Sequence, residues 1–304
     1  MNIHNLFYIE ESLTFFIHIT ITYKFILLGG KLMEYATLHN NLKMPLVGLG
    51  VYRLDTEEEM TTAISHALNC GYTLFDTAQM YKNEASLGRA LKTANMKRED
   101  LFLVSKVDNC NQWYDITKKS FMESLEKLQT DYLDLFLIHW PGQNRERTLS
   151  TWKAMEELYE EGKIKSIGVS NFEISHLEHL IANCNIKPMV NQIEHTPYTH
   201  NTELLDFCKK EQIQIMSWAP LLRGNMGNPI FIKLAEKYNC TTAQLILRWN
   251  TQQGITVIPK SKNPTRISEN IDIFDITISE EDITLLNSLN CNHRTAHDPN
   301  VFDF

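Results

Sequence analysis

Eight short apolar segments follow one another along the chain at similar intervals, with helical periodicity between them. The apolar segments read LVGLGVY, YTLFDTA, LFLVSKV, YLDLFLIHW, IKSIGVSN, PMVNQIE, IQIMSWAP and GITVIPKS. Helical periodicity is clearest over residues 57–68, 117–128, 149–159 and 202–210. Strands that alternate with helices pair in parallel, so the pattern predicts an α/β fold with a parallel sheet.

An eight-stranded (β/α) TIM barrel is the simplest closed form of such a sheet, and it needs about 250 residues. No Pro- or Gly-rich linker divides the repeats, which counts against the alternative, a doubly wound sheet split into two domains. The stretch YATLHNNLKM precedes the first strand, and its central His-Asn-Asn between alternating apolar residues predicts a hairpin. We expect this N-terminal hairpin to close the bottom of the barrel.

The N-terminal residues differ in character from the rest of the chain. The segment LTFFIHITITYKFILLGG is apolar, but His18 and Lys24 interrupt it and two glutamates precede it, unlike a signal peptide or membrane anchor. The GGKL before Met33 is what a ribosome-binding site and a short spacer would encode if translated. We therefore interpret residues 1–32 as a translated leader outside the fold, and residues 33–304 as a single barrel domain.

Charge and cysteine usage exclude several classes of partner. The formal net charge of −8 argues against non-specific binding to nucleic acid or to anionic membranes. The six cysteines form no Cys-x-x-Cys pair and show no metal-ligand spacing, which suits free thiols in a reducing compartment. We expect a cytoplasmic monomer that acts on a small molecule, without a metal.

Polar residues stand where nearly every predicted strand ends. In a barrel, the carboxyl ends of the strands form the rim on which catalytic residues lie. The residues at these ends are Asp76, Lys106, His139, Ser170, Asn171, Gln192, Trp218, Lys260 and Ser261. Strand interiors have little use for such side chains, so the rim is the expected site of chemistry.

Four of the predicted rim and loop residues describe a proton donor. Tyr81 lies five residues beyond Asp76, and a tyrosine hydroxyl, with a pKa near ~10, is a poor acid at neutral pH. An ammonium from Lys106 would lower that pKa, and the Asp76 carboxylate would hold the lysine charged. His139 could orient a carbonyl oxygen. Each residue alone is more often an ordinary rim residue, but the four together indicate protonation of a carbonyl while another group delivers hydride.

The stretch IPKSKNPTRISEN predicts an anion site after the last strand. Lys260 and Ser261 end the strand, Pro264 suits the first turn of a helix, and Arg266 lies in that turn. A helix N-terminus with two cations and a hydroxyl binds anions, and phosphates bind at this end of barrels. By contrast, the Gly48–Gly50 stretch is only half of a dinucleotide-binding fingerprint, since Arg53 replaces the third glycine.

These motifs resemble those of the aldo-keto reductase superfamily. The matching stretches are FDTAQMY, SK at Lys106, LIHWP around His139, IGVSNF, VNQIE and IPKSKNPTRISEN, and they run through nearly all of the chain after Met33. The short GQNRERT loop and the RTAHDPNVFDF tail are similar to those of bacterial glyoxal/methylglyoxal reductases and diketogluconate reductases. The resemblance implies NADPH-dependent reduction of aldehydes and ketones, such as methylglyoxal, glyoxal or diketogluconate, in a barrel without a Rossmann fold.

The resemblance also implies a role for each site residue. Tyr81 would be the general acid, Lys106 and Asp76 would tune it, and His139 would orient the carbonyl. The nicotinamide would be held by Ser170, Asn171 and Gln192, with Trp218 stacked on its ring. The 2′-phosphate would be held by Lys260, Ser261 and Arg266, and the adenosine by Glu269 and Asn270.

One position departs from the superfamily pattern. Relatives usually carry a tryptophan after SKV, as a wall of the substrate pocket, and this chain has Asp108. A carboxylate there would disfavour anionic substrates and favour small or polyhydroxylated neutral carbonyls. Tyr52, Trp113 and Trp140 could supply apolar walls instead, and in the alternative Asp108 points into solvent while Trp113 replaces the missing indole.

Two rival functions remain open on the sequence. In the first, the chain is a lyase that forms a Schiff base through Lys106, which leaves the anion site without a role. In the second, it is a non-catalytic NADPH-binding subunit, which leaves the four predicted catalytic residues without a role.

Overall fold

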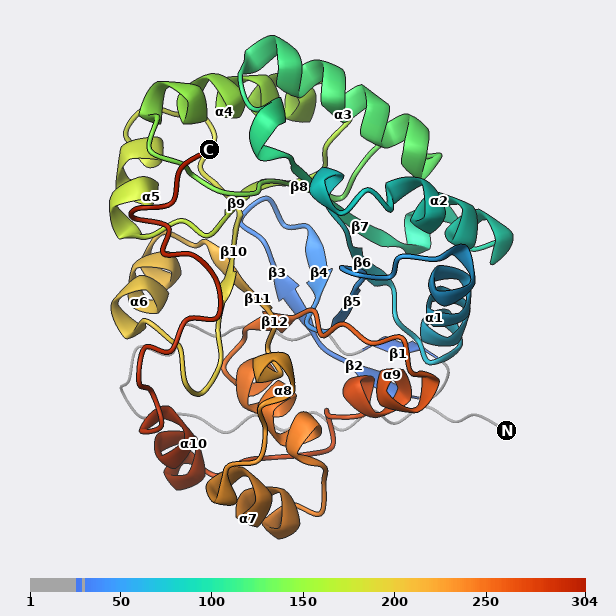
Figure 1. The fold of residues 1–304 in the computed structure, drawn as a ribbon, viewed down its shortest axis with the longest axis vertical. Helices are drawn as coiled ribbons and strands as arrows, with labels where there is room; N and C mark the ends of the chain where they lie inside the picture. The colour runs from blue at the N-terminus through green and yellow to red at the C-terminus, as the bar shows by residue number, and fades with distance from the viewer. Residues whose placement is uncertain (1–25, 29–30) are drawn as a thin grey trace, which may run out of the picture.

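The computed structural model of this chain describes residues 26–28 and 31–304, and its central feature is a barrel of parallel strands (Figure 1). The strands lie side by side in chain order, so that neighbours in sequence are neighbours in space. They are β5 (Gly48–Gly50), β6 (Leu74–Asp76), β7 (Phe102–Val107), β8 (Leu135–Ile138), β9 (Ile167–Ser170), β10 (Val190–Glu194), β11 (Gln214–Trp218) and β12 (Thr256–Val257). Parallel bridges from Val47 to Val257 and from Gly50 to Lys260 close the ring. The predicted eight-stranded barrel is confirmed.

Helices surround the strands. Those between or after the barrel strands are α1 (Glu57–Asn69), α2 (Glu84–Thr93), α3 (Tyr114–Leu128), α4 (Arg145–Glu160), α5 (Ile174–Ile181), α6 (Thr202–Lys210), α7 (Pro229–Lys237), α8 (Thr242–Gln252), α9 (Pro264–Ile271) and α10 (Glu280–Asn287). Several begin at a residue whose side chain accepts a hydrogen bond from a backbone N–H of the first turn, as Thr56 does for α1 and Asn263 for α9. The four segments predicted from helical periodicity all lie within helices of the structure.

The predicted hairpin consists of β3 (Tyr35–Thr37) and β4 (Lys43–Pro45), which pair antiparallel. Its buried residues Leu38 and Met44 pack with residues that begin the barrel strands, such as Leu74 and Leu135. The hairpin therefore closes the end of the barrel at which the strands start, as predicted, and Figure 1 shows it inside the ring of strands. The opposite rim, where the strands end, stays free for a functional site.

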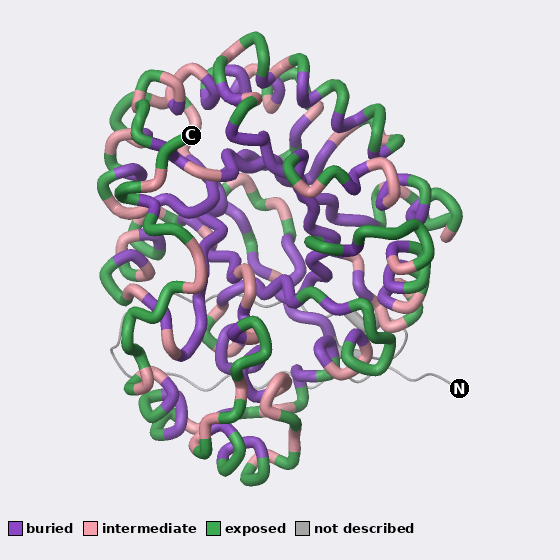
Figure 2. Tube along the Cα trace, in the orientation of Figure 1, coloured by how far each residue is buried: buried purple, intermediate pink, exposed green. Residues whose placement is uncertain are grey.

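The main hydrophobic core lies between the strands and the surrounding helices, and buried positions follow the inner side of the trace (Figure 2). Large side chains such as Phe121, Phe136 and Trp152 fill this layer. No helix within residues 26–28 and 31–304 is long and apolar enough to cross a membrane. The same residues contain no group of three or more His, Cys, Asp or Glu side chains that could hold a metal ion.

The predicted leader falls mostly outside the described residues, since residues 1–25 and 29–30 are not among them. The described part forms an antiparallel pair, β1 (Ile26–Leu28) with β2 (Lys31–Met33). From Met33 on, the chain belongs to the barrel body, because Met33 is buried and Glu34 forms a buried ion pair with Arg248 of α8 at 3.0 Å. The assignment of residues 1–32 as a leader stays a prediction.

A chain that starts at Met33 tests this assignment. It keeps the hairpin and the Glu34–Arg248 ion pair, so we expect its melting temperature to lie within about 2 °C of the full chain, which corresponds to less than about 1 kcal/mol. Thermal unfolding followed by circular dichroism would measure this. As a control, a chain that starts at Leu38 lacks β3 and leaves Arg248 unpaired, and should melt more than about 5 °C lower. A large drop for the Met33 chain would show that earlier residues support the fold.

Candidate active site

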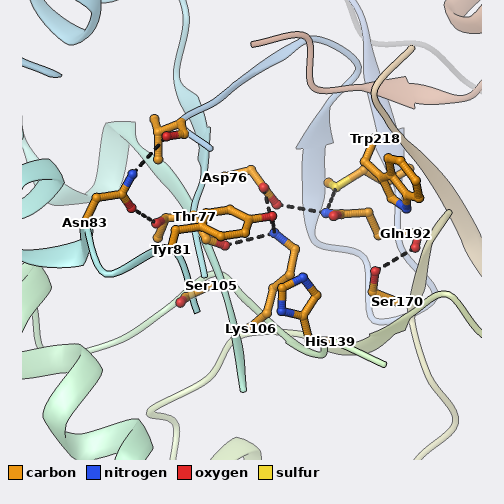
Figure 3. Close-up of polar contacts among 12 residues, drawn as sticks. Asp76, Thr77, Tyr81, Asn83, Ser105, Lys106, His139, Ser170, Gln192 and Trp218 are labelled. Atoms are coloured by element: carbon orange, nitrogen blue, oxygen red, sulfur yellow. Dashed lines mark hydrogen bonds and ion pairs between the residues drawn. The ribbon is translucent and has the colours of Figure 1, made fainter. Parts of the chain in front are cut away.

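The structure brings Asp76, Tyr81, Lys106 and His139 together at the carboxyl rim of the barrel (Figure 3). Lys106 is fully buried, and its Nζ donates to Asp76 Oδ1 at 2.7 Å and to the Thr77 carbonyl at 2.9 Å. The same Nζ lies 3.5 Å from the Tyr81 hydroxyl. Adjacent strands explain the meeting, since Asp76 ends β6, Lys106 lies near the end of β7, and His139 directly follows β8.

Tyr81 is held by the loop after β6. It ends the short 3-10 helix η1 (Gln79–Tyr81), and Lys82 then takes a left-handed conformation with φ of 58°. The half-buried Tyr81 ring lies between two other rings, with centroids 4.8 Å from Tyr52 and 5.8 Å from His139 in an edge-on arrangement. These contacts fix the direction in which the Tyr81 hydroxyl points.

Burial has the largest effect on the pKa values of Tyr81 and Lys106. It raises the pKa of Tyr81 well above its ordinary value, and the Asp76 carboxylate raises it further. Burial lowers the pKa of Lys106 while Asp76 opposes the shift. The sequence-based expectation of a lowered Tyr81 pKa is therefore wrong in its net direction, because burial, and then the Asp76 carboxylate, outweigh any lowering by Lys106. At neutral pH the phenol keeps its proton.

His139 is the neutral member of the group. Burial, and then the charge of Lys106, lowers the pKa of His139 well below its usual range. Its buried Nδ1 has no hydrogen-bond partner within residues 26–28 and 31–304. A neutral imidazole has one N–H donor and one acceptor nitrogen, so the ring can still bind a polar ligand atom.

The predicted nicotinamide-binding residues form one network with this group. Gln192 Nε2 donates to Asp76 Oδ2 at 2.8 Å, and Ser170 Oγ donates to the Gln192 carbonyl at 2.8 Å. The Asn171 amide donates to the His139 carbonyl at 3.0 Å and accepts from Trp218 Nε1 at 2.9 Å. The four residues therefore lie together beside Asp76 and His139, as predicted. Asn171 adopts a left-handed φ of 63°, which asparagine tolerates better than most residues.

The predicted anion site lies where the chain passes from β12 into α9. Asn263 caps the helix by accepting from the Arg266 backbone N–H at 3.1 Å, and Ser261 Oγ accepts from the Asn263 N–H at 3.1 Å. In the described part of the chain, the exposed Lys260 and Arg266 side chains form no ion pair, whereas Lys262 pairs with Glu59 of α1 at 2.7 Å. Burial and the neighbouring Lys262 lower the pKa of Lys260.

The two residues predicted to reach adenosine lie further along α9. Glu269 is half-buried and Asn270 is buried. Both follow the capped first turn of the helix that carries Arg266. At the start of the same helix, Lys260 and Arg266 are cations without an ion pair in the described part of the chain, beside a helix N-terminus that suits a phosphate.

The predicted substrate-wall residues differ in exposure and in contacts, and Tyr52 packs against Tyr81. Tyr52 and Trp113 are 47% and 39% exposed, large fractions for aromatic rings. Trp140 packs instead against the C-terminal segment, 4.9 Å from the ring of Phe302. Asp108 is only 7% exposed, so it does not point into solvent, and its Oδ2 lies 3.4 Å from Lys82 Nζ.

Sequence reasoning missed the polar residues that support the Tyr81 loop. Asn83 accepts from Thr77 Oγ1 at 2.9 Å and donates to the Val51 carbonyl at 2.9 Å. Gln79 accepts from the Asp108 backbone N–H at 2.9 Å, and Glu84 accepts from Ser105 Oγ at 2.6 Å. The signal was present, because Thr77, Gln79, Asn83 and Glu84 all stand in the stretch FDTAQMYKNE itself, but nothing in the sequence marked them as buried.

Comparison with known proteins agrees with this geometry. The model of the "Aldo/keto reductase family" matches residues 46–291. The chain is 46% identical over 274 residues to a glyoxal reductase of Bacillus subtilis, an alignment that covers 90% of this chain and 99% of the relative. It is 42% identical over 262 residues to the methylglyoxal reductase DkgA of Escherichia coli O157:H7, covering 85% and 94%.

A solved structure shows the same fold. The Bombyx mori aldo-keto reductase in complex with NADP superposes with a TM-score of 0.81 at 32% identity, covering 86% of this chain and 94% of that one. The barrel, the rim residues and the extent of the family match all agree with the resemblance expected from the motifs. This chain, an oxidoreductase of carbonyl groups, belongs to the aldo/keto reductase family.

Proposed function

We propose that this protein reduces small aldehydes and ketones to alcohols with NADPH, and that Tyr81 donates the proton. The observation that carries the proposal is the contact of one buried Lys106 Nζ with both the Asp76 carboxylate and the Tyr81 hydroxyl. A protonated phenol beside a charged lysine is suited to deliver a proton to an oxygen that becomes negative during the reaction.

The described residues fit the cofactor. NADPH, when bound, supplies the hydride. Lys260 and Arg266, which have no ion-pair partner in the described chain, would hold the 2′-phosphate, with Ser261 beside them. Gln192 Oε1 has no hydrogen bond within the described residues and can accept from a carboxamide, and the half-buried Trp218 can stack on a ring. The NADP-bound Bombyx mori relative supports this assignment.

This chain's own residues account for the proton transfer. The carbonyl oxygen accepts hydrogen bonds from the Tyr81 hydroxyl and the neutral His139 imidazole. As negative charge develops on that oxygen, the Tyr81 proton moves to it, and the resulting phenolate is stabilised by Lys106. Asp76 keeps the Lys106 ammonium charged against the effect of burial.

The substrate class follows from the relatives and from the rim. The relatives named for glyoxal and methylglyoxal support small dicarbonyls as substrates of this chain, and sugar ketones are the second candidate. Asp108, two residues after Lys106, would add hydrogen-bond acceptors for hydroxyl groups, although its contact with Lys82 partly offsets its charge. Removal of reactive carbonyls is the role that this chemistry suits.

The structure disfavours the lyase alternative. Lys106 is fully buried and its Nζ is engaged by Asp76 and the Thr77 carbonyl, whereas a Schiff-base lysine must reach the substrate as a free amine. Borohydride trapping of a carbonyl substrate on the protein without nucleotide would support that alternative. Turnover of any aldehyde with NADPH would contradict both rival functions.

Replacing the proposed acid tests the mechanism. Tyr81→Phe keeps the ring and removes the proton, so NADPH should bind as before while kcat for methylglyoxal falls at least about 100-fold. Cofactor quenching of tryptophan fluorescence measures binding, and NADPH consumption measures turnover. Unchanged turnover in a folded variant would show that Tyr81 is not the acid.

Cofactor preference tests the anion site. Charge-assisted contacts contribute about 1.5–3 kcal/mol each, so the wild type should prefer NADPH over NADH at least about tenfold in Kd. Lys260→Ala combined with Arg266→Ala should remove most of that preference by weakening NADPH alone. Lys262→Ala is the matched control, because its ammonium already pairs with Glu59 and should matter little. Equal affinity of the wild type for both cofactors would refute the assignment.

Asp108 tests the substrate range. Asp108→Trp restores an indole whose burial is worth roughly 1.5–3 kcal/mol, so kcat/KM for an aromatic aldehyde should rise about tenfold relative to methylglyoxal. Asp108→Asn removes the charge at nearly constant volume and should improve a keto acid more than methylglyoxal. If both variants change all three substrates equally, Asp108 does not face the substrate.

A further inference from the structure

A second buried carboxyl group lies close to the catalytic lysine. Glu84, the first residue of α2, is only 2% exposed, and its Oε1 accepts from Ser105 Oγ at 2.6 Å. Buried carboxyl groups are rare in proteins unless they are paired or hydrogen-bonded. The proposed reaction does not use Glu84, so its burial calls for an explanation.

The position of Glu84 relates it to Lys106. Ser105 precedes Lys106 on β7, and successive side chains of a strand point to opposite faces. Lys106 therefore faces the rim group with Asp76, while Ser105 faces the helix layer and binds Glu84. Asp76 and Glu84 therefore bind two adjacent residues of β7, Lys106 and Ser105, from opposite faces of the strand.

Glu84 also belongs to the segment that carries Tyr81. Hydrogen bonds tie this segment to β7 and to Asp108, which follows it. Before Tyr81, the Thr77 carbonyl accepts from Lys106 Nζ and the Gln79 side chain accepts from the Asp108 N–H. After Tyr81, Glu84 accepts from Ser105. Figure 3 shows Thr77, Tyr81 and Ser105 around Lys106. Glu84 is the last of these anchors.

The charge of Glu84 depends on its neighbours. Burial raises the pKa of Glu84, while hydrogen bonding by Ser105 and Ser124 lowers it. The ammonium groups of Lys127 and Lys82 lower it further. Across β7, the Glu84 carboxylate adds to the effect of Asp76 in raising the pKa of Lys106. The other groups that face Tyr81 are Asp76, Tyr52 and His139.

We propose that Glu84 is a positioning residue that is ionised in the native protein, anchors the Tyr81 segment, and keeps Lys106 charged and Tyr81 protonated to higher pH. This inference rests on the proposed role of Tyr81 as the acid. In the alternative, Glu84 only stabilises the N-terminus of α2, where an acidic residue is favourable anyway. The two explanations differ in what the charge does to the pH dependence of turnover.

The experiment is the pH profile of kcat for NADPH-dependent reduction of methylglyoxal. Turnover should fall at high pH as the coupled Tyr81–Lys106 group loses its proton. A nearby negative charge raises the pKa of that group, so removing it lowers the pKa and moves the alkaline limb to lower pH. For Glu84→Gln we expect the alkaline limb to move to lower pH by about half a pH unit or more. At a pH on that limb, kcat should be about threefold lower than in the wild type.

Two matched variants separate charge from structure. Ser105→Ala removes the hydrogen bond but keeps the carboxylate, so it should lower the melting temperature with a smaller shift of the limb. Glu57→Gln changes the first residue of α1, an exposed carboxylate that pairs with Arg89, and should leave the profile unchanged. The affinity for NADPH should be the same in all three variants, because none of these residues belongs to the anion site.

The outcomes are distinct. No shift in Glu84→Gln, or an equal shift in Ser105→Ala or Glu57→Gln, would overturn the inference while leaving the proposed function intact. Undiminished turnover in Tyr81→Phe would overturn the proposed function instead. A limb that moves to lower pH in Glu84→Gln, with the smaller or absent shifts expected of the two controls, would support the inference.

Discussion

The buried ion pair between Lys106 and Asp76 is the constraint on which the rest of the site depends. Removing an ammonium from water costs several kcal/mol, and the cost is offset only if every donor finds a partner in good geometry. Lys106 meets this requirement with Asp76 and the Thr77 carbonyl, and Tyr81 lies within reach. The pairing of β6 with β7 supplies these partners, because it sets Asp76 opposite Val104, two residues before Lys106.

The same pair joins the two halves of the barrel. Asp76 uses one oxygen for Lys106 and the other for Gln192, which lies on β10. Gln192 in turn accepts from Ser170 through its carbonyl, so the ion pair is continuous with the proposed cofactor-binding residues. Beneath this polar layer, the hairpin residues Leu38 and Met44 close an apolar interior. The polar network is therefore held between strands that cannot slip without breaking the barrel.

Much of this arrangement could be predicted from the sequence, because parallel strands in a barrel end at one rim. That rule placed Asp76, Lys106, His139 and Gln192 together without any knowledge of side-chain contacts. The motif resemblance then assigned roles to them, and the family match confirms the class of enzyme. The cytoplasmic, monomeric state and the leader before Met33 stay predictions.

What could not be predicted depends on partners far apart in the sequence. The pKa of Tyr81 rises because its hydroxyl is buried and because the Asp76 carboxylate lies nearby, and neither effect can be weighed without coordinates. Lys262 and Lys260 stand in the same motif, yet within the described residues Lys262 forms an ion pair with Glu59 of α1 and Lys260 forms none.

The contact of Glu84 with Ser105 is a second feature that could not be predicted from the sequence. A strand presents alternate residues to its two faces, so Ser105 and Lys106, adjacent in sequence, have different surroundings. The rim face of β7 binds Asp76 and the helix face binds Glu84, and both carboxyl groups act on one ammonium. In the mechanism proposed above, the properties of Lys106 are thus set in part by the helix layer behind β7, a region whose sequence pattern indicates core packing and no chemistry.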